Sequence, residues 1–171
     1  RTYRQYFQDY RTFLARPRRV CAELTPQLQT RRELYVVSLD IKSFFDHVDR
    51  SALLKELQHL EAVYRTAHGL PESLAADELF WERTARVFSW QWRAEDQKQA
   101  ELILGGEHQQ LELGLPQGLV ASGFLANAYL VRFDQDMQKF ATEGGTVGDD
   151  VKLRDYCRYV DDMRLVVEAK S

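Results

Sequence analysis

Cysteine, proline and long apolar runs are scarce in this 171-residue chain, and each shortage excludes a class of protein. The only cysteines, Cys21 and Cys157, lack metal-type spacing, and with four scattered histidines they do not form a zinc motif. There is no proline-rich linker, internal repeat or low-complexity tract. No apolar run approaches the roughly 20 residues that span a bilayer, and the N-terminus lacks a signal-peptide pattern. We therefore expect a reducing, cytoplasmic environment and no membrane contact.

The remaining composition is that of a folded globular protein. Hydrophobic residues make up 44% of the chain and aromatic residues 12%, enough for one domain with a sizeable core or for one and a half smaller ones. The chain starts with Arg1, and its last apolar run stops just before Ser171. We interpret it as a fragment of a longer protein and expect fused or associated domains outside it.

The net charge of −3 is unevenly distributed. Residues 1–32 contain eight arginines and two acidic residues, a net charge of +6, which leaves −9 for the rest of the chain. Aromatic residues are interleaved with these arginines, and guanidinium groups pair with phosphates while aromatic rings stack on bases. The segment therefore suits a polynucleotide or a triphosphate, with Arg11, Arg16 and Arg18 as candidate primer or template contacts. The alternative is an amphipathic helix whose arginines face solvent.

The hydrophobic pattern of the first half predicts three helices and a strand. The basic N-terminal segment is expected to be helical to about Leu28. The near-continuous apolar run Leu34–Leu39 is typical of a strand buried on both faces. A helix is expected from about Ser51, capped by Asp49 or by Ser51 itself. Another is expected from about Asp77 to Trp92.

The second half predicts two hairpins separated by a long helix. Residues 100–115 suggest a hairpin, because Gly105-Gly106 supplies the positive φ angles of a tight turn. A long helix is expected from about Ala121 to Phe140. The last hairpin pairs Tyr156–Tyr159 with Met163–Val167. This order predicts an α+β fold with helices on one face of a largely antiparallel sheet.

Three aspartates occupy positions where a carboxylate calls for a partner. Asp40 ends an apolar strand, and a charge there needs an ion pair or a cation. Asp161 and Asp162 are neighbours at the turn of the last hairpin, where their repulsion is tolerable in solvent or useful around a divalent cation. Taken alone, an Asp-Asp pair is ordinary turn chemistry. The combination with Asp40 favours a metal site.

Three ordered motifs carry a resemblance to a known family: Asp40-Ile41-Lys42-Ser43-Phe44-Phe45-Asp46, then Leu115-Pro116-Gln117-Gly118 with Ser122 and Ala126-Asn127 downstream, then Tyr159-Val160-Asp161-Asp162. Over residues 34–167 the chain resembles the reverse transcriptase (RNA-directed DNA polymerase) family. Gly123 stands after Ser122 where many intron-type and retroviral-type enzymes have proline, so the resemblance points to a divergent bacterial branch, such as the phage-defence enzymes. Intron, retron and CRISPR-associated roles stay open.

The resemblance implies a right-hand polymerase fold. Residues 1–33 would be partial fingers, basic and mainly helical. Residues 34–171 would form the palm, with a helical insertion at about 70–98 and no thumb. The implied reaction adds deoxynucleotides to a primer 3′-hydroxyl on an RNA or DNA template, the primer being DNA or RNA. Because a thumb clamps the duplex, we expect the fragment alone to polymerise weakly or not at all.

The resemblance also implies a set of metal ligands. Asp40 and Asp161 would bridge two magnesium ions, for which manganese could substitute, and the Ile41 carbonyl would be a further ligand. Asp162 would add a third, supporting carboxylate. Two such ions, about 4 Å apart, serve phosphoryl transfer by activating the attacking oxygen and neutralising the leaving group. Hard oxygen ligands suit magnesium.

A nucleotide pocket beside the metals is implied as well. Phe45 matches the family's steric gate, a ring that leaves no room for a ribose 2′-hydroxyl, and Phe44 is expected to lie in the core on the opposite side of an extended backbone. The backbone amides near Ser43 and Phe44 would face the triphosphate. The other implied contacts are Gln117 and Gly118 with the nucleotide, and Tyr159 and Val160 with the primer.

Two alternative functions share parts of this pattern, and one further motif is misleading. A viral-type RNA-dependent RNA polymerase would share the palm and the metals, and a retired polymerase could act as a nucleic-acid-binding scaffold. Retention of all three aspartates argues against the scaffold. Gly148-Asp149-Asp150 imitates a viral polymerase motif, but the glycines around it indicate a solvated loop.

Overall fold

The computed structural model describes residues 6–71, 78–103, 113–148 and 150–171. The chain divides into two compact units. Unit 1 combines residues 1–42 with residues 131–171, and unit 2 comprises residues 43–130. Within the described ranges, no helix is both long enough and apolar enough to cross a bilayer.

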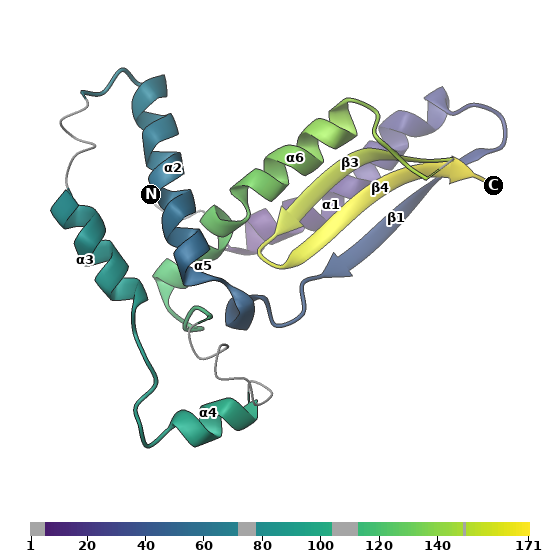
Figure 1. Cartoon of the computed structure of the whole chain (residues 1–171). Coiled ribbons are helices and arrows are strands. Elements are labelled where there is room, and N and C mark those ends of the chain that lie inside the picture. The colour runs from purple at the N-terminus through teal and green to yellow at the C-terminus, as the bar shows by residue number, and fades with distance from the viewer. Residues whose placement is uncertain (1–5, 72–77, 104–112, 149) are drawn as a thin grey trace. The chain divides into compact units, whose positions relative to one another are not determined.

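Unit 1 is built on a four-stranded antiparallel sheet in the order β1-β4-β3-β2 (Figure 1). Its strands are β1 (Arg32–Asp40), β2 (Thr146–Val147), β3 (Val151–Tyr159) and β4 (Asp162–Lys170). The predicted last hairpin is confirmed as β3–β4, and both strands are longer than expected. Val160 and Asp161 form the connecting turn, so the prediction that Asp161 and Asp162 make the turn is off by one residue.

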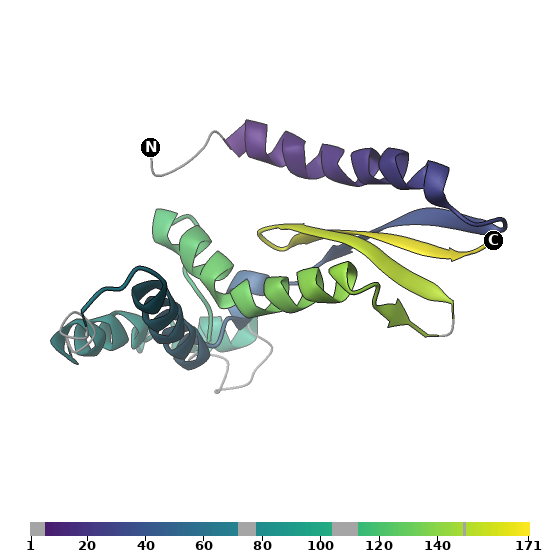
Figure 2. The same cartoon turned by 90° about the horizontal axis from the view of Figure 1, so that it is seen from above.

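Helices cover both faces of this sheet, seen from above in Figure 2. Helix α1 (Tyr6–Leu24) packs on one face through Arg16, which binds Asp155. Helix α6 (Val131–Thr142) packs on the other, where Asp134 binds Tyr156. Successive residues of a strand point to opposite faces, so neighbouring positions of β3 serve different helices. The prediction of helices on one face only is therefore wrong.

Strand β1 lies at the edge of the described sheet, paired with β4. The prediction of a strand here is confirmed, but the prediction of burial on both faces is wrong. Tyr35 and Val36 are 44% and 49% exposed. The apolar run indicated a strand correctly, whereas burial depends on neighbouring elements, and the described helices pack mainly on β3 and β4.

Unit 2 is mainly helical, with α2 (Arg50–Ala67), α3 (Glu78–Phe88), α4 (Gln97–Ile103) and α5 (Val120–Tyr129). Its core includes fully buried Val48, Leu53 and Ala126. The predicted cap is confirmed, because the Asp49 carboxylate accepts hydrogen bonds from the backbone amides of Ser51 (2.8 Å) and Ala52 (3.0 Å). Such a cap satisfies amides that lack an intrahelical partner.

Two predicted elements differ from the structure. The expected helix Ala121–Phe140 is two helices, α5 and α6, separated at Leu130. Helix α4 occupies the start of the expected hairpin at residues 100–115, because a short apolar run suits a helix as well as a strand. The predicted turn at Gly105-Gly106 lies outside the described residues.

Ion pairs join the strands at the end of the sheet remote from the β3–β4 turn. Buried Glu168 lies between Arg32 (3.2 Å) and Arg154 (3.1 Å). Asp150, in the turn between β2 and β3, pairs with Lys170 at 2.6 Å. The pKa of Asp150 is lowered, chiefly by its hydrogen bond from Lys170. Gly148 and Asp150 thus belong to a turn, as expected, and Asp149 lies outside the described residues.

Candidate active site

The register of the sheet brings the three predicted carboxylates to one end. Asp40, the last residue of β1, lies opposite Asp162, the first residue of β4. The Ile41 amide donates a hydrogen bond to the Asp161 carbonyl oxygen (3.2 Å). Paired residues of antiparallel strands have Cα atoms about 4.5–5.5 Å apart. Acidic residues separated by more than a hundred positions along the chain therefore become neighbours.

The turn that carries Asp161 has an unusual backbone. Val160 has a φ of 58°, in the left-handed region that β-branched residues rarely adopt. Such conformations persist where the surrounding structure over-determines them, and they are common at functional sites. Arg158 contacts this turn, since its Nη1 donates to the Val160 carbonyl oxygen (2.5 Å).

The predicted primer contact Tyr159 lies against helix α1. Its ring centroid is 5.2 Å from that of Tyr10 and 5.8 Å from that of Phe13. The guanidinium of Arg164 also lies over the Phe13 ring, 5.3 Å from its centroid. Aromatic packing joins α1 to the carboxylate end of the hairpin, and a primer contact by Tyr159 stays a prediction.

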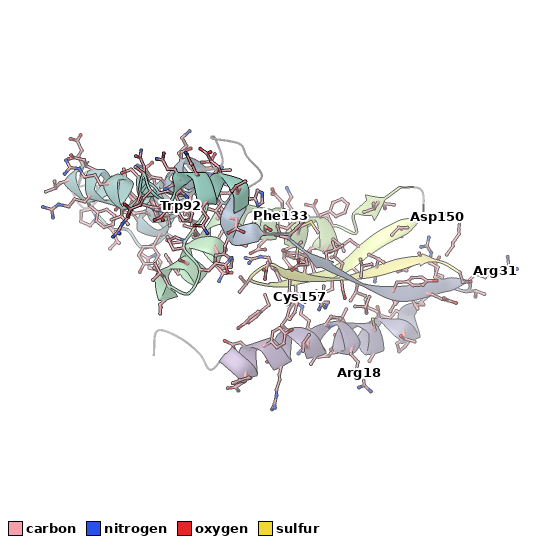
Figure 3. The ribbon with its side chains drawn as sticks, turned by 90° about the horizontal axis from the view of Figure 1, so that it is seen from below. Arg18, Arg31, Trp92, Phe133, Asp150 and Cys157 are labelled. Atoms are coloured by element: carbon pink, nitrogen blue, oxygen red, sulfur yellow. The ribbon has the colours of Figure 1, made fainter. Side chains whose placement is uncertain are left out.

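The basic residues of α1 divide into two groups. Arg16 donates two hydrogen bonds to Asp155, at 2.7 and 2.9 Å. The hydrogen bond to Asp155 outweighs desolvation and raises the pKa of Arg16. Arg11 and Arg18 are exposed, and Arg18 projects from α1 away from the sheet, whereas Cys157 lies between the sheet and α1 (Figure 3). Arg11 and Arg18 are therefore open to a ligand, while Arg16 already binds a carboxylate within unit 1.

In unit 2, two distant segments place the predicted nucleotide-pocket residues close together. The Leu115 amide donates to the Phe45 carbonyl oxygen (2.7 Å), and the Gly114 amide donates to that of Val48 (2.8 Å). Gly114 has a φ of 92°, and a Cβ atom there would lie 3.2 Å from the Asp46 carbonyl oxygen. The positive φ and this tight approach together favour glycine. The two hydrogen bonds hold the backbone of Phe45 and of Val48 against the start of the loop that carries Gln117.

The loop leading into α5 is held by a buried serine. Ser122, 3% exposed, donates through its Oγ to the Pro116 carbonyl oxygen (2.5 Å). Gln117 and Gly118 are exposed, and Gly118 has a φ of 87°. Glycine adopts such a positive φ without steric cost.

The segment around Phe45 is not extended. Residues Phe44–His47 form a 3₁₀ turn, preceded by Ser43 with a φ of 51°. The prediction that an extended backbone places Phe44 and Phe45 on opposite sides is therefore wrong in its geometry. Its outcome for Phe44 is confirmed, since this residue is 5% exposed and Phe45 is only half-buried.

Comparison with known proteins bears on this arrangement. The family model described as reverse transcriptase (RNA-dependent DNA polymerase) matches residues 5–171. The chain belongs to the reverse transcriptase family. No curated protein matches it significantly. Membership supports nucleotidyl transfer of the RNA-directed DNA polymerase type, with a nucleic-acid template and primer and nucleotides as substrates. The mixed α+β fold with its antiparallel sheet is consistent with a polymerase palm.

Reverse transcriptases generally use divalent metals, and the donor chemistry of this chain fits them. Asp40, Asp161 and the Ile41 carbonyl offer the hard oxygen ligands that magnesium prefers. Across the described ranges, no group of three or more His, Cys, Asp or Glu side chains is placed to hold a metal ion. Nη1 of Arg164 lies 3.6 Å from Oδ1 of Asp162, the carboxylate to which the resemblance assigns a supporting role. The backbone thus brings the candidate ligands to one end of the sheet, while their side chains do not converge on one point.

The contacts that hold the Val160–Asp161 turn were not predicted from the sequence. Arg158 and Tyr156 on β3 both bind Asp134 on α6. An arginine directly before the Tyr159-Val160-Asp161-Asp162 motif was visible in the sequence, but its partner, 24 positions away, was not.

Proposed function

We propose that this chain carries the catalytic core of a reverse transcriptase that adds deoxynucleotides to a primer by two-metal-ion nucleotidyl transfer. The main support is the pairing of Asp40 with Asp162 next to the hydrogen bond between Ile41 and Asp161. Asp40 and Asp161 would hold the ions together with the Ile41 carbonyl oxygen. Asp162, next to Arg164, would contribute charge. When bound, two magnesium ions activate the primer hydroxyl and neutralise the departing pyrophosphate.

The remaining residues would bind and select the nucleotide. Phe45, held beside Leu115, would lie under the sugar and exclude a 2′-hydroxyl. Gln117 would orient the incoming nucleotide, because its loop is fixed at Pro116 by the Ser122 hydroxyl. The amides near Ser43 and Phe44 would face the triphosphate. These roles extend the same proposal to deoxynucleotide preference.

The broader setting is part of the proposal. We assign the chain to a bacterial-type enzyme that acts on an RNA or DNA template with a DNA or RNA primer, with Arg11 and Arg18 on nucleic acid. The palm would extend from about residue 34 and the partial fingers would precede it. Phage defence is one of the roles that such a core serves.

A metal titration tests the proposal. Electron paramagnetic resonance of Mn²⁺ should detect binding to the chain, and Asp161→Ala should weaken it by more than about tenfold, since a directly bound ligand matters at least as much as its supporting groups. Asp150→Ala is the matched control, because Asp150 is an aspartate in another turn of the same sheet. Equal Mn²⁺ binding by the native chain and by Asp161→Ala would contradict the metal assignment and favour a scaffold role.

A further inference from the structure

Arg158 lies almost wholly buried between the sheet and helix α6. Its side chain is 6% exposed. It binds Asp134 through two hydrogen bonds, Nε to Oδ1 (2.9 Å) and Nη2 to Oδ2 (2.6 Å). The Tyr156 hydroxyl donates to the same Asp134 carboxylate (2.7 Å). Two β3 residues therefore converge on one α6 carboxylate, and all three belong to unit 1.

The same guanidinium reaches the turn between β3 and β4. Its third nitrogen, Nη1, donates to the Val160 carbonyl oxygen at 2.5 Å. Val160 carries the left-handed φ of 58°, and the next residue is Asp161. One planar side chain thus connects helix α6 to the peptide that links Val160 to Asp161.

We propose that Arg158, anchored by Asp134, is a positioning residue that holds the Val160–Asp161 turn in its strained conformation and so places Asp161 for metal binding. The placement of Asp161 for metal binding rests on the proposed function, whereas the effect of Arg158 on the conformation of the turn does not. Asp134, on another element, supplies the fixed point. In this role Arg158 is not a metal ligand and acts through the backbone of the turn, by its hydrogen bond to the Val160 carbonyl oxygen.

The chemistry of arginine suits this role. The guanidinium is a rigid fork that can bind a carboxylate along one edge and still present a further N–H elsewhere. Burial alone would lower the pKa of Arg158, but the hydrogen bond and charge of Asp134 outweigh burial and raise it. The group therefore stays charged and keeps its donors. A lysine carries the same charge at one point and cannot span both partners.

The test compares Arg158→Lys and Asp134→Asn with the control Arg154→Lys. Arg154 is on the same strand and pairs with Glu168, away from the turn. Hydrogen exchange at the Ile41 amide, measured by NMR on the 171-residue chain, reports the turn because this amide donates to the Asp161 carbonyl. Mn²⁺ affinity reports the placement of Asp161. Urea unfolding reports global stability.

We expect Ile41 exchange to accelerate at least about tenfold in both test variants, and Mn²⁺ affinity to fall about 10-fold to 100-fold, the range for groups that orient metal ligands. Arg154→Lys should change neither. Ile41 protection that is unchanged in folded Arg158→Lys would overturn the proposal, as would equal acceleration in the control. If the native chain binds no Mn²⁺, the proposed function fails, and the exchange data still decide whether Arg158 holds the turn. Should Arg158→Lys not fold, Asp134→Asn gives the same decision.

Discussion

Replacing Arg16 by alanine tests whether the arginines of α1 have separate roles. Arg16 donates two charge-assisted hydrogen bonds to Asp155, which is 7% exposed. The substitution leaves a buried carboxylate without this partner. Breaking a fully buried ion pair costs about 3–5 kcal/mol. The Arg16 side chain is 36% exposed, so water can enter where it was removed, and we expect a smaller decrease of about 2–3 kcal/mol in the free energy of unfolding.

Arg18→Ala is the matched control, since Arg18 is an exposed arginine two positions away on the same helix. It should change stability by less than about 0.5 kcal/mol, as is usual for exposed sites. Urea denaturation followed by circular dichroism measures both variants. The double variant Arg16→Ala/Asp155→Ala should be destabilised by less than the sum of the two single variants, because no unpaired charge remains.

For nucleic-acid binding we expect the opposite order, with a larger effect from Arg18→Ala than from Arg16→Ala. If Arg18 binds a phosphate, Arg18→Ala should reduce the slope of log affinity against log salt by roughly 0.7–0.9. Arg16→Ala, measured under conditions where it is folded, should leave that slope unchanged. Equal stabilities of Arg16→Ala and Arg18→Ala would refute the reasoning from the Arg16–Asp155 pair. A reduced salt dependence in Arg16→Ala would refute the exclusion of Arg16 from the nucleic-acid surface.

Two further predictions concern unit 2. In primer extension, Phe45→Ala should raise ribonucleotide incorporation relative to deoxynucleotide incorporation, because the ring proposed to exclude a 2′-hydroxyl would be gone. Phe44→Leu, a change in the core, should leave this ratio unchanged. An unchanged ratio for Phe45→Ala would show that Phe45 is no gate. The pKa of Asp49 is lowered, first by the hydrogen bond from the Ala52 amide and then by that from Ser51. The helix cap that Asp49 forms should contribute about 1 kcal/mol to the free energy of unfolding above the unfolded pKa near 4. This contribution should be lost as the pH falls through the lower folded pKa. Asp49→Asn should remove this pH dependence from urea-unfolding data, and an identical pH profile for Asn and Asp would contradict the assignment.

The features that were predictable from sequence depend on nearby residues. The Asp49 cap needs only the next three positions, and the β3–β4 hairpin needs only alternation on both sides of a turn. The motif around Asp161 is likewise contiguous. Local chemistry therefore identified these features, whereas the burial of Phe44 was expected from an extended backbone that the structure does not have.

The predictions that were wrong concern features that depend on packing between elements distant in the sequence. The apolar run of β1 predicted burial, yet β1 is an edge strand of the described sheet, and Tyr35 is exposed. Helix α4 replaced an expected strand because a short apolar run does not distinguish the two. A helix on each face of the sheet was not expected, since alternation along β3 shows two faces but not what covers them.

The sequence by itself determined which residue types are present for chemistry: Asp40, the Asp161-Asp162 pair and the phenylalanine at 45. Tertiary structure alone decided that Asp40 lies opposite Asp162 and that Asp134 anchors Arg158 beneath the turn. Strand register and helix packing are cooperative properties of the whole core, in which a slip of one residue would send every side chain of β1 to the other face. No local pattern encodes such pairs, so the proposed ligands could be named from the sequence, and the contacts around them could not.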